Sequence, residues 1–120
     1  MEVEDQLPLH EATFFILLSL LPGINHGYGI MQDVAALSNG RLKLSTGTLY
    51  GALKRLLELA WIERFDDPAA ADGGRERKAY RLTELGRRIT AAETARLEQV
   101  TAVAQQRAVA QQRALALQRP

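Results

Sequence analysis

One short run carries the pattern of a helix that is followed at once by a strand: STGTLYGALKRLLELAWIERF, residues 45–65. Ser45 is of a type that favours the position just before a helix. The leucines recur at spacings of four and three residues, which places their side chains on one face: Leu49, Leu53 and Leu56. Residues 61–65 are rich in strand formers. We therefore predict an amphipathic helix whose apolar face continues to Ala60 and which leads directly into a strand.

Two further helices are predicted upstream of this run. The first covers residues 10–21 and ends at Pro22-Gly23, and the second covers about residues 28–37. The predicted apolar stripe of the first is Phe14, Leu17, Leu18 and Leu21. The predicted stripe of the second is Ile30, Val34 and Leu37.

Downstream, residues 77–82 alternate in character as a second strand does, and residues 66–76 are predicted to be the loop between the two strands. Thr83 is expected to cap a long helix. Three helices, a β-hairpin and a final helix make a mainly α chain with the winged helix-turn-helix plan. We predict a winged helix-turn-helix domain over residues 1–83 and a C-terminal dimerisation helix over residues 84–120.

The C-terminal helix contains a repeat, in which AVAQQR at residues 102–107 recurs at 108–113 and, altered, at 114–119. Six residues turn an α-helix by about 600°, so equivalent positions do not share a face. The repeat therefore forms no stripe, and the tail beyond Val103 is expected to fray. A weaker apolar seam predicts the dimer contacts: Leu85, Ile89, Ala92, Val100 and Val103.

Charge is distributed unevenly along the chain, although the net charge is only +1. Residues 1–40 contain five acids and no Lys or Arg, whereas residues 41–88 contain eleven Lys or Arg and seven acids. A basic middle segment suits a polyanionic partner, and it equally suits a solvated surface.

The face of the 45–58 helix opposite its leucines is small, polar and cationic. These are the properties that a helix needs to enter the major groove of double-stranded DNA. Gly47 and Gly51 are costly inside a helix, and either close approach to DNA or relief of crowding against a neighbouring helix would explain them. The predicted DNA-contacting residues here are Tyr28, Lys43, Ser45, Thr46, Gly47, Thr48, Tyr50, Gly51, Lys54 and Arg55.

The hairpin is predicted to supply a second DNA-contacting element, the wing. Its expected contacts with the duplex are Arg75, Arg77 and Lys78, and the Asp66-Asp67 arm is expected to point away. The segment from 66 to 78 contains four acids and three bases, so its overall charge does not favour DNA.

Three motifs in this order resemble the PadR family of transcriptional regulators: HGYGI at 26–30, STGTLY at 45–50 and RERKAYRLT at 75–83. The resemblance implies a winged-helix domain, a C-terminal helix that completes a homodimer, and repression through a palindromic operator. It also implies release by a small aromatic or amphipathic ligand in some members. The family's DNA-reading helix falls on residues 45–57 and its wing on residues 65–78.

The chain departs from the family pattern at three positions. Gly51 stands where proline is usual, Ala60 where glycine commonly ends the DNA-reading helix, and Ala79 where an aromatic residue is usual. The first two are expected to leave the fold intact while altering how the helix sits and ends.

Other functions find little support in the sequence. There is no cysteine, the two histidines are not clustered with carboxylates, and no phosphate-binding glycine loop occurs. We therefore expect no enzymatic activity, cofactor or metal. The longest apolar stretch is too short for a bilayer, and a cytoplasmic protein is expected.

Two alternatives stay open. Trp61 could stack on a planar effector, but its place beside Ile62 favours the core, and a ligand pocket is expected in a dimer cleft between the first and last helices. A winged-helix module that binds proteins instead of DNA would suit the acidic N-terminal segment.

Overall fold

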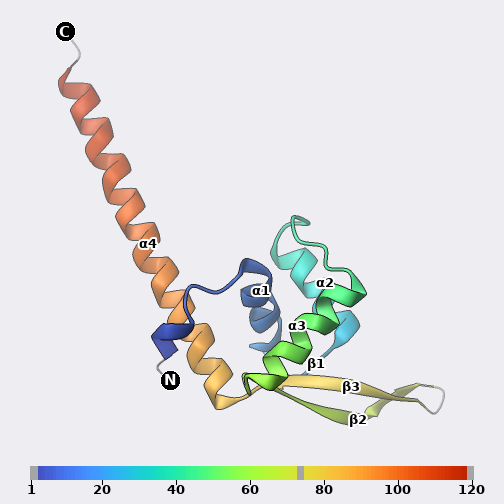
Figure 1. Ribbon diagram of the computed structural model, residues 1–120. Helices are drawn as coiled ribbons and strands as arrows, with labels where there is room; N and C mark the ends of the chain where they lie inside the picture. Colours follow the sequence, from blue (N-terminus) through green and yellow to red (C-terminus); the bar gives the residue numbers. More distant parts are fainter. Residues whose placement is uncertain (1–2, 73–74, 119–120) are drawn as a thin grey trace.

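The computed structural model describes residues 3–72 and 75–118, without the side chains of residues 68–77. Its elements follow in this order: η1 Val3–Gln6, α1 Glu11–Leu20, β1 Asn25–His26, α2 Gly27–Leu37, α3 Thr46–Glu58, β2 Ile62–Asp72, β3 Arg75–Leu82 and α4 Glu84–Leu117. This is the predicted winged helix-turn-helix plan with a long C-terminal helix. Figure 1 shows α3 lying above the base of the β2–β3 hairpin, which projects away from the helices.

Within the described residues the sheet has the order β1–β3–β2, and both pairings are antiparallel. The two residues of β1 pair with Tyr80 and Ala79, a contact that the sequence did not predict. The prediction of a loop over residues 66–76 was wrong, because β2 continues to Asp72 and β3 begins at Arg75. The wing is therefore a long two-stranded arm.

The core lies where α1, α2 and α3 meet the sheet and the start of α4. Its buried apolar side chains are Ile16, Leu17, Leu20, Ile30, Val34, Leu49, Leu53, Leu56, Trp61, Ile62, Tyr80, Leu82 and Ile89. The three predicted leucines of α3 are all confirmed, and the core interpretation of Trp61 is confirmed by its 5% exposure.

Three predicted apolar positions were wrong. In α1 the buried face includes Ile16 and Leu20, and Leu21 is 49% exposed. Leu37, the last residue of α2, is also exposed. Ala60 does not extend the apolar face of α3, since it is exposed and adopts a left-handed backbone conformation with φ of +62°.

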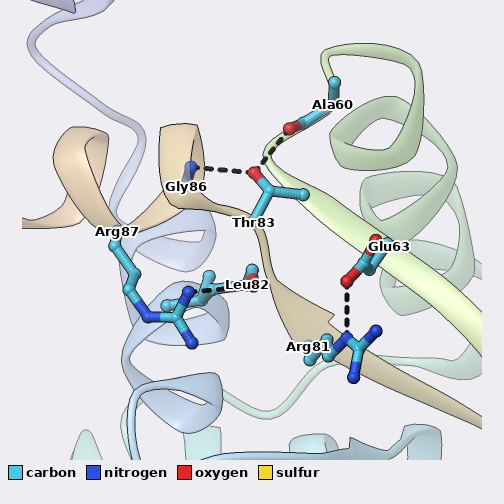
Figure 2. Close-up of polar contacts among 7 residues, drawn as sticks. All are labelled: Ala60, Glu63, Arg81, Leu82, Thr83, Gly86 and Arg87. Atoms are coloured by element: carbon cyan, nitrogen blue, oxygen red, sulfur yellow. Dashed lines mark hydrogen bonds and ion pairs between the residues drawn. The ribbon is translucent and has the colours of Figure 1, made fainter.

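A compact joint connects α3, β2 and α4. The Thr83 hydroxyl accepts a hydrogen bond from the Gly86 amide (3.0 Å) and donates one to the Ala60 carbonyl (2.6 Å), as Figure 2 shows. The Thr83 amide donates to the Trp61 carbonyl at 3.0 Å. Any side chain at Gly86 would overlap with that same carbonyl, so α4 packs against Trp61 through a bare backbone.

The distal half of α4 extends away from the rest of the chain (Figure 1). The helix is continuous to Leu117, whereas the sequence led us to expect fraying beyond Val103. Every described residue from 103 to 118 is exposed. None of the helices in the described part of the chain combines the length and the apolar character needed to cross a membrane.

Candidate nucleic-acid interface

The exposed face of α3 begins at a well-formed cap. The Ser45 hydroxyl accepts a hydrogen bond from the Thr48 amide at 3.1 Å and lies 2.9 Å from the Thr48 hydroxyl. This bond satisfies one of the free amides of the first turn. Ser45, Thr46 and Thr48 are all exposed, so the leading end of α3 presents three hydroxyl groups to solvent.

The two glycines of α3 face open space. A Cβ atom added at Gly47 or Gly51 would have no neighbour within 4 Å among the described residues. The sequence also allowed these glycines to relieve crowding against a neighbouring helix. Among the described residues of the chain, that explanation is excluded. In the part of the chain that the structure describes, no packing compensates the conformational cost of these glycines.

Tyr50 positions α3 against α2. Its hydroxyl lies so close to Gly27 that any side chain there would overlap with it. The glycine at the start of α2 thus lets the two helices approach, which gives a physical reason for part of the HGYGI motif. Tyr50 keeps about half of its surface exposed, and Tyr28, which follows Gly27 on α2, is 65% exposed.

The cations on this surface are free. Lys43, Lys54 and Arg55 are exposed, and none of them has an ion-pair partner among the side chains that the structure describes. These cations lie among the predicted DNA-contacting residues on and next to α3, and we call this set the α3 face: Tyr28, Lys43, Ser45, Thr46, Gly47, Thr48, Tyr50, Gly51, Lys54 and Arg55.

The cations of the wing are placed differently. Lys78 pairs with Asp66, which lies directly opposite it in the β2–β3 register. Arg81 bonds Glu63 at 2.5 Å and lies over the Phe65 ring, 5.0 Å from its centroid. Figure 2 shows the Arg81–Glu63 pair at the base of the wing. Strand pairing sets Asp66 beside Lys78, so this acid lies next to one of the predicted DNA contacts of the wing. That the Asp66-Asp67 arm points away from the duplex stays a prediction.

Arg75 and Arg77 lie in β3, but their side chains lie outside the described residues. At the base of the wing, His26 Nε2 lies 3.2 Å from Asp67 Oδ2. This contact ties the outer strand to the residue that precedes α2. The contact between His26 and Asp67 spans three strands and requires a register that the sequence does not supply.

Arg64 is a candidate that the sequence analysis missed. It is exposed on β2 directly opposite Tyr80, on the side of the sheet that carries α3. Burial raises the pKa of Tyr80, and the nearby Arg64 and Lys78 act in the opposite direction. Only the strand pairing reveals that Arg64 lies opposite Tyr80, near the start of the wing.

The predicted dimer contacts on α4 divide into two groups. Ile89 is 1% exposed in the core of its own chain, and Leu85 packs against the same core. The assignment of Ile89 to a dimer interface was therefore wrong, since its side chain is already used within the chain. Ala92 is half-buried, whereas Val100 and Val103 are exposed on the projecting part of α4.

Among the residues that the structure describes, no group of three or more His, Asp or Glu side chains could hold a metal ion. The arrangement offers a surface for binding, with free cations and exposed hydroxyls on one helix. Its three helices, its hairpin and the α3 face define a winged helix-turn-helix protein.

The chain belongs to the PadR-like family of transcriptional regulators, whose family model matches residues 16–92. That family consists of regulators of transcription rather than enzymes. No curated protein matches the chain in sequence.

Three solved structures are similar in fold. A PadR family regulator from Clostridium difficile is 24% identical with a TM-score of 0.69, over 81% of this chain and 97% of that one. PadR from Bacillus subtilis, solved in complex with operator DNA, is 22% identical with a TM-score of 0.61, and the match covers 71% of this chain and 47% of that one. BpsR from Bordetella bronchiseptica is 22% identical with a TM-score of 0.61, and the match covers 83% of this chain and 70% of that one. Its DNA binding is regulated by 6-hydroxynicotinic acid.

Proposed function

We propose that this protein is a sequence-specific DNA-binding regulator that represses transcription as a homodimer on a palindromic operator. The observation that carries the proposal is the α3 face. Its two glycines face open space within the described part of the chain, and its cations Lys43, Lys54 and Arg55 have no ion-pair partner among the described side chains. The operator complex of the Bacillus subtilis relative supports the same assignment.

In this proposal α3 enters the major groove with its leucines anchored in the core. The exposed hydroxyls of Ser45, Thr46 and Thr48 hydrogen-bond to base edges or phosphates, and Gly47 and Gly51 let the helix backbone approach the duplex. Lys54 and Arg55 neutralise phosphates, while the wing follows the flanking backbone.

The homodimer would form through α4. Because Ile89 is committed to the core, the contacts proposed here are the exposed apolar side chains farther along the helix: Leu97, Val100 and Val103. A two-fold dimer would place two α3 helices on half-sites about one helical turn, roughly 10 bp, apart. Sedimentation at micromolar concentration should show a dimer, and a monomer there would contradict this part of the proposal.

The test of DNA binding is its dependence on salt and sequence. Footprinting on the promoter region of the protein's own gene should reveal a protected palindrome. Affinity for that duplex should fall linearly on a log–log plot with salt, by about 0.9 per phosphate neutralised. Equal, weak affinity for unrelated duplexes at all salt concentrations would contradict a sequence-specific regulator.

A protein-interaction module is the second candidate function. The acids at the N-terminal end of the chain, Glu4, Asp5 and Glu11, and the acids of the wing favour it. It predicts a protected α3 face in a protein complex and no footprint on DNA, so the same experiment separates the two functions.

We further propose that a small molecule regulates DNA binding. The Bordetella bronchiseptica relative supports this proposal, since a small aromatic acid regulates its DNA binding.

A further inference from the structure

The wing projects away from the helices, so its direction depends on the contacts at its base (Figure 1). One of these contacts crosses the whole sheet. His26 lies in β1, and its Nε2 atom is 3.2 Å from Asp67 Oδ2 on β2, with β3 between the two strands. The two side chains are only 23% and 22% exposed, so solvent screens this contact less than it screens a fully exposed pair.

The strand register explains how the two side chains meet across β3. His26 stands opposite Ala79, and Ala79 stands opposite Phe65 on β2. Paired residues of neighbouring strands direct their side chains to the same face of a sheet, and so do residues two apart along one strand. Asp67 lies two residues beyond Phe65 and therefore shares this face with His26. Because Ala79 carries only a methyl group, it leaves the imidazole room to cross the central strand.

The backbone of His26 is held by its neighbours and leads directly to α3. The His26 amide donates a 2.9 Å hydrogen bond to Asn25 Oδ1. The next residue is Gly27, the first of α2, and the Tyr50 hydroxyl of α3 packs directly against it. This series of contacts connects Asp67 on the wing, through His26, to Tyr50 on the α3 face.

We propose that His26 and Asp67 form a latch that fixes the direction of the wing relative to α3, and that a proton on His26 tightens the latch. Histidine is the side chain that ordinarily changes its charge between pH 5 and 8. A neutral imidazole with its proton on Nε2 donates one hydrogen bond to the carboxylate, and an imidazolium adds the attraction of opposite charges. The two are positioning residues. Their consequence for DNA binding, a wing fixed in advance, rests on the proposed function.

The other charged groups on the face of the latch come from β2 and β3. Glu63 and Arg81 bond each other at 2.5 Å, nearer to the base of the wing. Arg77 stands opposite Asp67 in the register and so belongs to the same face. Arginine keeps its charge at every pH of interest, so its attraction for Asp67 is a constant background to the proton on His26.

The opposite face of the sheet and α2 supply further charges near the latch. Lys78 and Asp66 bond each other on that face, and the register places Arg64 on it too. On α2, the Asp33 carboxylate accepts a 3.0 Å hydrogen bond from the Asn25 side chain. Lysine, arginine and carboxylate side chains ordinarily keep their charges between pH 6 and 8, so a response in that interval reports on a histidine.

The latch is tested first without DNA, by hydrogen exchange of the wing amides at pH 6 and pH 8. After correction for the intrinsic effect of pH on exchange, the wing of the unmodified chain should be about fivefold better protected at pH 6. His26→Gln keeps a hydrogen-bond donor that does not titrate, so its protection should be equal at the two pH values. Equal protection in the unmodified chain would overturn the latch.

A matched control is available because the chain has two histidines. His10 is exposed and lies just before α1, so His10→Gln should keep the full difference between pH 6 and pH 8. Loss of the difference in that variant would assign the response to His10 and overturn the proposal. Asp67→Asn keeps the shape of the side chain and removes its charge, so it should reduce the difference to less than about twofold.

The effect on DNA is measured separately, by fluorescence anisotropy with the footprinted duplex at constant ionic strength. The unmodified chain should bind about threefold more tightly at pH 6 than at pH 8, because a wing that is already fixed loses less freedom on binding. Asp67→Asn should abolish this difference. If the difference persists in Asp67→Asn, the histidine acts on DNA through its charge alone, and the role of the latch in binding is overturned. Failure to bind any duplex at either pH would refute the proposed function, while hydrogen exchange would still judge the latch.

Discussion

The α3 face and the wing carry cations in two different states. On the α3 face Lys43, Lys54 and Arg55 have no partner among the described side chains, whereas in the wing Lys78 pairs with Asp66 and Arg81 with Glu63. Such exposed pairs contribute only about 0–1 kcal/mol to stability, but each must be exchanged before its cation can bind a phosphate. Among the cations whose side chains the structure describes, we therefore expect those of the α3 face to contribute more to the proposed DNA binding than those of the wing.

The strongest test of this difference places an acid on the α3 face. Gly51→Glu should lower DNA affinity about 100-fold, because a carboxylate would then face the phosphates at close range. The fold should survive, since a Cβ atom at Gly51 would have no neighbour within 4 Å in the part of the chain that the structure describes. Fluorescence anisotropy with the operator duplex measures the loss, and Gly51→Ala with unchanged affinity would show that the backbone does not approach the DNA closely.

Removal of a free cation should have the next largest effect. Lys54→Ala should weaken binding about tenfold and should reduce the salt slope by roughly one unit per half-site. Lys78→Ala is the matched wing variant and should reduce affinity less, because Asp66 already competes for that side chain. Equal losses in the two variants would show that the ion pair in the wing has no influence on binding.

A substitution in the wing should also be able to raise the affinity for DNA. Asp66→Asn removes the carboxylate that pairs with Lys78, so DNA affinity should rise about threefold and the salt slope should steepen. The measurement is the same titration over several salt concentrations. A decrease in affinity would mean that Asp66 orients Lys78 toward the duplex and does not withhold it.

The smallest effect on binding is expected at the residue that joins the two regions. Ala60 adopts φ of +62°, a conformation that glycine accepts without strain. Ala60→Gly should raise the free energy of unfolding by about 1 kcal/mol and leave DNA affinity within twofold. Thermal or denaturant unfolding measures the gain. A loss of stability would show that the methyl group contributes packing that outweighs the strain.

The parts of the fold that depend on local chemistry could be predicted from the sequence. The hydroxyls of Ser45 and Thr83 cap α3 and α4 as expected, and the leucine spacing of α3 gives its buried face. The same reasoning failed for α1, because nearly every residue from Ala12 to Leu21 is apolar and several stripes fit equally well. Leu20 is buried and Leu21 is not, and only the packing of neighbouring helices decides this.

The parts of the site that depend on long-range pairing could not be predicted. Asp66 stands opposite Lys78, and Glu63 opposite Arg81, only because β2 and β3 pair in one particular register. The sequence shows that residues 66–78 contain four acids and three bases, but it does not show which of these side chains are neighbours. The structure also contains a cavity of about 250 Å³ that is lined by residues far apart in the chain, such as Pro8, Arg55 and Trp61, and only the folded chain brings them together.

The joint at Thr83 has a mechanical consequence. It fastens α4 to Ala60 and Trp61 by hydrogen bonds and by the bare backbone of Gly86, so α4 and α3 should rotate as one unit. With 34 residues at 1.5 Å each, α4 is about 51 Å long. A tilt of this whole unit by about 10° would displace one end of α4 relative to the other by roughly 9 Å at that length. In a dimer held by α4, small changes of crossing angle would therefore set the separation of the two DNA-reading helices, and hence the operator lengths that the protein accepts.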